Sequence, residues 1–181
     1  CASAPAQAVS LIRDAEIEHT LHEMADPIFA AAGLKPSAVK IFIVQDDSLN
    51  AYVAGGSNLF VHTGLLMEMT SPDMLLGVIA HETGHIAGGH LAKGAEKLKD
   101  AQLDTILTYV VGAAAGAATG RPEAAAAVIA GGSTTIGRNF IAFTRTHEEA
   151  ADQAALGFLD KLGISASGLA KTFAMLERNQ R

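Results

Sequence analysis

The sequence has a single cysteine, few aromatic side chains and no long run of apolar residues. Because the one cysteine is Cys1, these 181 residues cannot form an intrachain disulfide or a zinc site made of cysteine thiolates. Only 5% of the residues are aromatic, whereas 49% are hydrophobic and 18% are charged. This composition, rich in small apolar residues, is typical of a globular protein rather than a disordered one.

Basic residues are scarce as well. The chain has 13 lysines and arginines against 19 aspartates and glutamates, a formal net charge of −6. No stripe of basic residues could neutralise phosphates, so we expect no nucleic-acid partner. The charge-free stretches 105–120 and 124–137 hold 16 and 14 residues. Both are shorter than the roughly 20 residues that a helix needs to span the hydrocarbon core of a membrane.

The first eight residues are mostly small, and their composition differs from that of the rest of the chain. Residues 1–8 are expected to form a tail before a single domain that covers residues 9–181. The tail is similar to the end of an export signal, with Ala6-Gln7-Ala8 as a small-x-small cleavage site, and this predicts an exported protein. Two other interpretations remain open. Cys1 could carry a lipid as the first residue of a lipoprotein, or the tail could be a cloning remnant.

The domain is expected to have an α+β fold, with a small sheet beside a larger helical body. Apolar positions at helical spacing predict a first helix over 9–32, ended by Gly33. Runs of β-branched and aromatic residues predict three strands, at 40–45, 50–54 and 58–62.

The second half is expected to be helical. Ser71-Pro72-Asp73 has the features of a helix start, and this helix is expected to continue to about Leu98. Apolar periodicity and turn residues predict the later helices at 105–119, 124–137, 145–161 and 168–178.

The segment His81-Glu-Thr-Gly-His85 carries the clearest chemistry. Residues four apart share one face of an α-helix, so His81 and His85 can offer two imidazole nitrogens to one metal ion. Glu82 lies farther around the helix and can reach a water molecule on that ion, as in H-E-x-x-H zinc peptidases. Thr83 and Gly84 are small, which we interpret as room for metal and substrate. The alternative is an ordinary helix with one surface and one core histidine, although burying such polar groups without a ligand is costly.

A catalytic zinc site needs a third protein ligand, and the segment 144–152 offers candidates. Glu148 and Asp152 are four apart and share one face of a second helix. Glu148 would complete the ligand set, and Asp152 would accept a hydrogen bond from the far N–H of a ligand histidine. Glu149 points elsewhere and is expected to be solvated. His147 is a ligand candidate in principle, but a supporting or surface position is the preferred interpretation.

These motifs resemble those of the gluzincin metallopeptidase family that contains the type I CAAX prenyl proteases and the HtpX heat-shock proteases. The matching segments follow one another along the chain: 50–52, 55–66, 78–85 with His90, 144–152 and 163–169. Together they cover most of residues 9–178, which is far more specific than H-E-x-x-H alone. The resemblance is closest to the soluble exported branch, whose members often carry a tetratricopeptide-repeat domain and act in envelope quality control.

The resemblance implies a zincin-type metallopeptidase domain with one Zn²⁺ per chain. It implies His81, His85 and Glu148 as ligands, Glu82 as general base and Asp152 as support for a ligand histidine. It also implies an endopeptidase of unfolded or misassembled envelope proteins in the bacterial periplasm. A repeat domain missing after residue 181 and a stand-alone peptidase are both compatible with the sequence.

Other features of the sequence leave alternatives open. No residue is clearly placed to stabilise the oxyanion, and Tyr52, Arg145 and His147 are the candidates. The strand at Gly56–His62 is expected either to pair with an extended substrate at the rim of the cleft or to be an ordinary hairpin strand. Residues 105–137 are expected to form a helical hairpin beside the active site, with a membrane or outer-membrane protein contact as the alternative.

The sequence also suggests roles for His62 and His90 and leaves two competing functions open. His62 is expected to be a strand histidine, and His90, placed on the same helix as His85, is expected to be structural. The main competing function is a chaperone-like or scaffold module that keeps the metal site but rarely cleaves. Hydrolysis of a non-peptide amide is the third interpretation.

Overall fold

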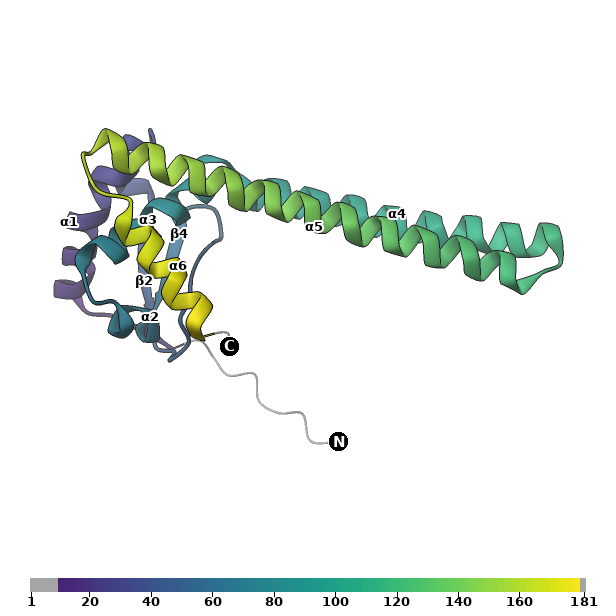
Figure 1. Cartoon of the computed structure of the whole chain (residues 1–181), viewed down its shortest axis with the longest axis horizontal. Coiled ribbons are helices and arrows are strands. Elements are labelled where there is room, and N and C mark those ends of the chain that lie inside the picture. Colours follow the sequence, from purple (N-terminus) through teal and green to yellow (C-terminus); the bar gives the residue numbers. More distant parts are fainter. Residues whose placement is uncertain (1–9, 180–181) are drawn as a thin grey trace. The chain divides into compact units, whose positions relative to one another are not determined.

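The computed structural model describes residues 10–179, which form the predicted α+β fold (Figure 1). The predicted tail, residues 1–8, lies outside the described residues. The chain divides into two compact units. One unit, here called the sheet unit, comprises the chain up to Gly88 and from Ala150 onward. The other, the hairpin unit, comprises Gly89–Glu149.

The sheet unit begins with a short strand and a helix and continues into the rest of the sheet. Its N-terminal elements are β1 (Leu11–Ile12), α1 (Ala15–Ala31), the 3₁₀ turn η1 (Pro36–Ala38), β2 (Lys40–Val44), β3 (Ala51–Ala54) and β4 (Asn58–His62). Its helical elements are α2 (Thr63–Glu68), α3 (Pro72–Ala87), the C-terminal part of α5 (Pro122–Lys161) and α6 (Ser167–Asn179).

The four strands form one mixed sheet in the order β1-β2-β4-β3. The pair β2–β4 is parallel, whereas β1 and β3 pair antiparallel with their neighbours. One face of the sheet is buried, because alternate residues such as Ile43 and Val61 belong to the main hydrophobic core. On the other face, the rings of Phe42, Phe60 and Tyr52 stack across three strands, with successive centroids 5.0 Å apart.

Of the two interpretations of the strand Gly56–His62, the ordinary hairpin strand is confirmed and the exposed edge is wrong. This strand is β4, which hydrogen bonds to β2 on one side and to β3 on the other, so its backbone groups are already paired. Within the described sheet, β3 is the strand at that edge. Sequence spacing alone could not show this, because the parallel β2–β4 pairing joins strands that are not consecutive in the chain.

Helices α1, α3 and α6 bury their apolar faces with the sheet in one core. Two glycines allow close backbone packing on α3. A Cβ added to Gly77 would lie 2.7 Å from the backbone of Leu169, and one added to Gly84 would lie 2.8 Å from the carbonyl oxygen of Ala151. Both distances are shorter than real Cβ contacts. Only glycine therefore lets α3 approach α6 and α5 so closely at these positions.

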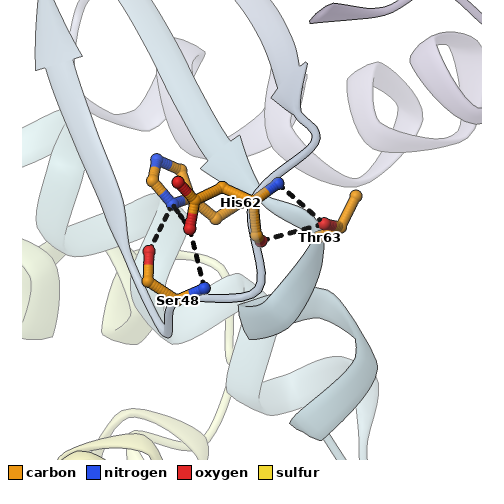
Figure 2. Close-up of polar contacts among 4 residues, drawn as sticks. Ser48, His62 and Thr63 are labelled. Atoms are coloured by element: carbon orange, nitrogen blue, oxygen red, sulfur yellow. Dashed lines mark hydrogen bonds and ion pairs between the residues drawn. The ribbon is translucent and has the colours of Figure 1, made fainter. Parts of the chain in front are cut away.

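Hydrogen bonds connect the loop after β2 to the start of α2 (Figure 2). The Thr63 hydroxyl donates to the carbonyl oxygen of Asp46 at 2.9 Å and accepts from the Asp46 backbone N–H at 3.1 Å. The Asp46 carboxylate accepts from the Ser48 backbone N–H at 2.8 Å, and the Ser48 hydroxyl oxygen lies 2.8 Å from His62 Nδ1. Hydrogen bonds from Ser48 hold the pKa of the Asp46 carboxyl below its ordinary value, and the nearby His62 acts in the same direction.

The first helix is shorter than the predicted 9–32. Residues Leu11–Ile12 pair with β2 as a strand, and α1 starts after them at Ala15. Asp14 caps this helix, because its carboxylate accepts from the backbone N–H groups of Glu16 and Ile17.

The expected continuous helix from Ser71 to about Leu98 is also wrong. Helix α3 ends at Ala87, and Gly89 has φ of 62°, a left-handed conformation that glycine adopts without a steric penalty. A new helix, α4 (His90–Thr119), starts directly afterwards. Ser71 does occupy the N-cap position of α3, but its side chain makes no capping hydrogen bond.

The hairpin unit consists of α4 and the N-terminal part of α5, which run side by side (Figure 1). This confirms that residues 105–137 form a helical hairpin, with the turn at Gly120, whose φ is 66°, while its expected place beside the active site stays a prediction. The helices are longer than expected, because α5 runs without a break through the predicted helices at 124–137 and 145–161. In the range 10–179, no helix is both long and apolar enough to span a membrane.

Candidate metal centre

His81 and His85 bring their imidazole rings together on α3. Their Nε2 atoms lie 3.1 Å apart, and their ring centroids are 4.8 Å apart. Two ligands at about 2.1 Å from a tetrahedral zinc ion would be separated by about 3.4 Å. The two Nε2 atoms are therefore close to the separation that one metal ion requires, as the four-residue spacing predicts.

Asp152 on α5 fixes the ring of His81. Its Oδ1 atom lies 2.8 Å from His81 Nδ1, so the carboxylate can accept the proton of that nitrogen. With Nδ1 protonated, the lone pair of Nε2 points away from Asp152 and is available to a metal ion. The ring of Phe173 on α6 contacts the same imidazole edge-on, with centroids 5.9 Å apart. The side chain of His81 is 14% exposed, which leaves it little freedom to rotate.

The two small residues inside the motif serve packing. Thr83 is fully buried and donates its hydroxyl proton to the carbonyl oxygen of Ile79 at 2.6 Å. Gly84 faces the backbone of Ala151, one residue before Asp152. The interpretation that both residues leave room for metal and substrate is therefore wrong. They allow α5 to pack against α3, and this packing brings Asp152 to His81.

Glu82 lies directly after the first histidine of the motif. It is 8% exposed, unusually low for a glutamate, since charged residues are rarely buried without partners. Its side chain is therefore buried in the sheet unit. In the chain, Glu82 lies between His81 and His85.

Glu148 lies four residues before Asp152 on the same uninterrupted helix, α5. Residues with this spacing share one helix face, so Glu148 projects from the same side of α5 as Asp152. Its side chain is exposed. Its role as the third ligand stays a prediction. The neighbouring Glu149 is exposed, as expected.

His147 and His90 lie together in the hairpin unit. Their rings stack with centroids 4.3 Å apart, and Phe143 lies 4.0 Å from His147 on its own helix. His90 starts α4 and does not belong to α3, so its expected position relative to His85 on a single helix is wrong. The ring stack gives His90 and His147 a packing role at the base of the hairpin.

The two remaining candidates for stabilising the oxyanion are Arg145 and Tyr52. Arg145 is exposed and lines a shallow surface depression of about 380 Å³ together with Arg138 and Glu149. Tyr52 stacks on Phe60 and contacts the ring of His62 edge-on, with centroids 5.7 Å apart. His62 lies at the end of β4, as predicted for a strand histidine.

A comparison with known families decides the class of this protein. The model of peptidase family M48 matches residues 12–178, which is nearly the whole chain. The chain belongs to peptidase family M48. Members of this family are metal-dependent, so the chain is a metallopeptidase domain. The predicted family and enzyme class are thereby confirmed.

Individual M48 relatives are similar over most of this chain. A putative beta-barrel assembly-enhancing protease of Vibrio cholerae serotype O1 is 27% identical over 174 residues, covering 94% of this chain and 35% of its own length. The beta-barrel assembly-enhancing protease of Escherichia coli K12 is 26% identical, covering 88% and 32%. The metalloprotease LoiP of E. coli K12 is 29% identical, covering 80% and 53%. The chain thus spans about a third to a half of the length of these relatives.

Proposed function

We propose that this M48 domain is a zinc endopeptidase that hydrolyses peptide bonds of unfolded or misassembled cell-envelope proteins. The observation that carries the proposal is the convergence of His81 Nε2 and His85 Nε2, with Asp152 on the far nitrogen of His81. Two imidazoles, one of them oriented by a carboxylate, are a donor set suited to zinc.

The proposed ligands of one zinc ion per chain are His81, His85 and Glu148. The position of Glu148 one helical turn before Asp152 supports its choice, because Asp152 already touches a ligand histidine. A carboxylate and two imidazoles form the His₂Glu set of catalytic zinc sites, which keep a fourth position for water or substrate. A zinc ion bound there would polarise the peptide carbonyl and lower the pKa of a water molecule.

In this proposal, Asp152 orients a ligand histidine and Glu82 transfers protons during the reaction. Asp152 holds a proton on Nδ1 of His81, which keeps Nε2 free to bind the metal. Glu82 is proposed as the general base that accepts a proton from the attacking water and returns it to the nitrogen of the leaving amine. Its burial removes competing water, which strengthens electrostatic interactions in the site.

Substrate binding is proposed at the β3 edge of the sheet. Strand β3 has a partner only on its β4 side within the described sheet, and it also contacts α3, the helix that carries the histidines. An extended peptide can add to such an edge through main-chain hydrogen bonds, which depend little on side-chain identity. This mode of recognition fits unfolded polypeptides better than one folded partner.

An envelope location is part of the proposal. The Ala6-Gln7-Ala8 pattern of an export signal supports it, and so do the names of two relatives that refer to β-barrel assembly. A bacterial periplasmic protein, lipid-anchored through Cys1 or released, fits both observations. A repeat domain beyond these residues is compatible with the greater length of the relatives.

The proposal is tested by measuring zinc content and cleavage of an unfolded protein such as reduced, carboxymethylated casein. Wild type is expected to hold one zinc per chain and to cleave. Glu82→Gln is expected to keep the zinc and to cleave at least 100-fold more slowly, a typical loss for a general base. Glu149→Gln serves as a matched control, because it changes an exposed glutamate, and should behave as wild type.

Other outcomes would reject parts of the proposal. Equal cleavage by wild type and Glu82→Gln would remove Glu82 as the base. A Glu148→Ala variant with unchanged zinc affinity would remove the third ligand. Suppressed aggregation of the unfolded protein with no cleavage would favour the chaperone-like module instead.

A further inference from the structure

Helix α4 of the hairpin unit turns small residues toward α5 and carries large apolar side chains on its outer face. Where the two helices meet, Gly112 of α4 faces Ile129 of α5, Gly116 faces Ala125, and Gly132 faces Thr108. The outward side chains of α4 are large and apolar, and each is 55–60% exposed: Leu103, Ile106, Leu107, Tyr109, Val110 and Val111. We call these six residues the apolar arc of α4.

The apolar arc is too wide for a typical helix-to-helix contact. At 100° per residue, its members spread over about 200° of the circumference of α4, nearly everything that does not face α5. The apolar stripe of a helix that packs on one protein partner is narrower, about 100° wide or somewhat more. A second copy of this chain, docked helix against helix, would leave much of the arc in water.

Most of the apolar arc lies in a charge-free stretch, with the exposed Asp104 near its N-terminal end, and the serine and threonine hydroxyls of this part of the hairpin do not depend on water. Residues 105–120 and 124–137 contain no Asp, Glu, Lys or Arg. The serine and threonine hydroxyls within 105–137 all donate to the carbonyl oxygen four residues earlier, at 2.7–3.0 Å: Thr105, Thr108, Thr119, Ser133, Thr134 and Thr135. Such back-bonding, which other helices of this chain share, leaves these hydroxyl groups satisfied without water and is therefore compatible with lipid contact. An uncharged surface of this kind complements hydrocarbon.

From these observations we infer that the apolar arc of α4 embeds in the hydrocarbon of a phospholipid bilayer and holds the hairpin on the membrane surface. Helix α5 differs from α4, because its exposed residues within 124–137 are all Ala, Gly, Ser or Thr. The α4 side of the hairpin is therefore the side that enters the lipid. The inference does not depend on the peptidase activity.

The turn at the tip limits how deeply the hairpin can enter. Arg121 and Glu123 lie between the two charge-free stretches, and placing charges at the centre of a bilayer is costly. The 16 residues of 105–120 are about 24 Å long as a helix, less than the roughly 30 Å of hydrocarbon. The hairpin therefore lies along the surface within one leaflet, with both charged side chains at the level of the headgroups.

The first test is flotation of the 181-residue chain with vesicles of pure phosphatidylcholine, at low salt and in 1 M NaCl. Because the arc is uncharged, wild type is expected to float with these neutral vesicles at both salt concentrations. Val110→Glu is expected to weaken binding about tenfold. Met67→Glu is the matched control: Met67 is an apolar residue of α2 that is 84% exposed, and its variant should bind as wild type does.

The second test uses the absence of tryptophan from the chain. Val110→Trp and Met67→Trp each introduce one fluorophore. On addition of vesicles, emission from Val110→Trp should shift to the blue and be quenched by lipids with brominated acyl chains, whereas Met67→Trp should not change. A folded wild type that stays unbound would overturn the inference, as would equal binding of Val110→Glu or an unquenched Val110→Trp. Concentration-dependent dimers in sedimentation velocity, lost in Val110→Glu and without vesicle binding, would assign the arc to a second copy instead.

Discussion

The carboxylate of Asp152 lies 2.8 Å from Nδ1 of His81, although the two residues are 71 positions apart in the chain. This contact joins helix α3 to the C-terminal part of helix α5. It sets the orientation of one proposed ligand through the packing of two helices. The geometry of the metal centre therefore depends on how the sheet unit folds, and changes that affect this packing should affect metal binding.

Asp152→Asn should weaken zinc binding by about 10- to 100-fold, the usual cost of losing such a support. The amide can still accept a hydrogen bond from Nδ1 of His81, but it lacks the negative charge that raises the basicity of the ring. The zinc dissociation constant can be measured by competition with a chromophoric chelator. Asp160→Asn, an exposed site two turns farther along α5, should leave it unchanged. Equal zinc affinity of wild type, Asp152→Asn and Asp160→Asn would show that the Asp152 carboxylate does not support His81 as a ligand.

Gly84→Ala should destabilise the fold by about 1–3 kcal/mol, the usual cost of overpacking. The added methyl group would lie 2.8 Å from the carbonyl oxygen of Ala151, so α5 must move away from α3. Chemical denaturation measures the loss, and zinc affinity should fall with it because Asp152 follows Ala151. Gly157→Ala is the matched control in an open position of α5. It should be neutral or stabilise by up to about 1 kcal/mol, since alanine favours helices. A stable Gly84→Ala protein would contradict the close packing.

Residues that share one helix face could be predicted from the sequence, whereas the ends of helices could not, for a physical reason. Helical spacing alone indicates that His81 faces His85 and that Glu148 shares a face with Asp152. It does not indicate where a helix stops at glycine, because glycine is tolerated inside helices. The end of α3 before Gly89 was missed for this reason.

Long-range contacts were the other part that the sequence could not provide. The pairing of β2 with β4 places β4 inside the sheet, and no local pattern encodes which strands become neighbours. Gly84 was interpreted as space for a ligand because the helix that fills that space lies far along the chain. In both cases the missing information was tertiary packing.

Asp46→Asn should lower the melting temperature at neutral pH, and the difference from wild type should vanish in acid. Folding lowers the pKa of the Asp46 carboxyl through hydrogen bonds from Ser48. Its contribution to stability is therefore present above the ordinary aspartate pKa of about 3.9 and is lost as the pH falls through the lowered, folded-state value. Melting curves from pH 7 to pH 2 test this, with Asp47→Asn at the exposed neighbouring position as control. A difference that persists at pH 2 would mean that the ionised carboxylate is not its source.

Ser71→Ala should leave stability unchanged or raise it by up to about 1 kcal/mol, although replacing a capping serine commonly costs about that much. Ser71 occupies the N-cap position of α3, but its hydroxyl makes no capping hydrogen bond. Its oxygen is buried and has no hydrogen-bond partner among residues 10–179, so removing it relieves a desolvation cost. Asp14→Ala provides the contrast, because the Asp14 carboxylate accepts two backbone hydrogen bonds at the start of α1. Denaturant unfolding should show a loss of about 1 kcal/mol for Asp14→Ala and none for Ser71→Ala. A comparable loss in both would mean that Ser71 caps α3 in solution.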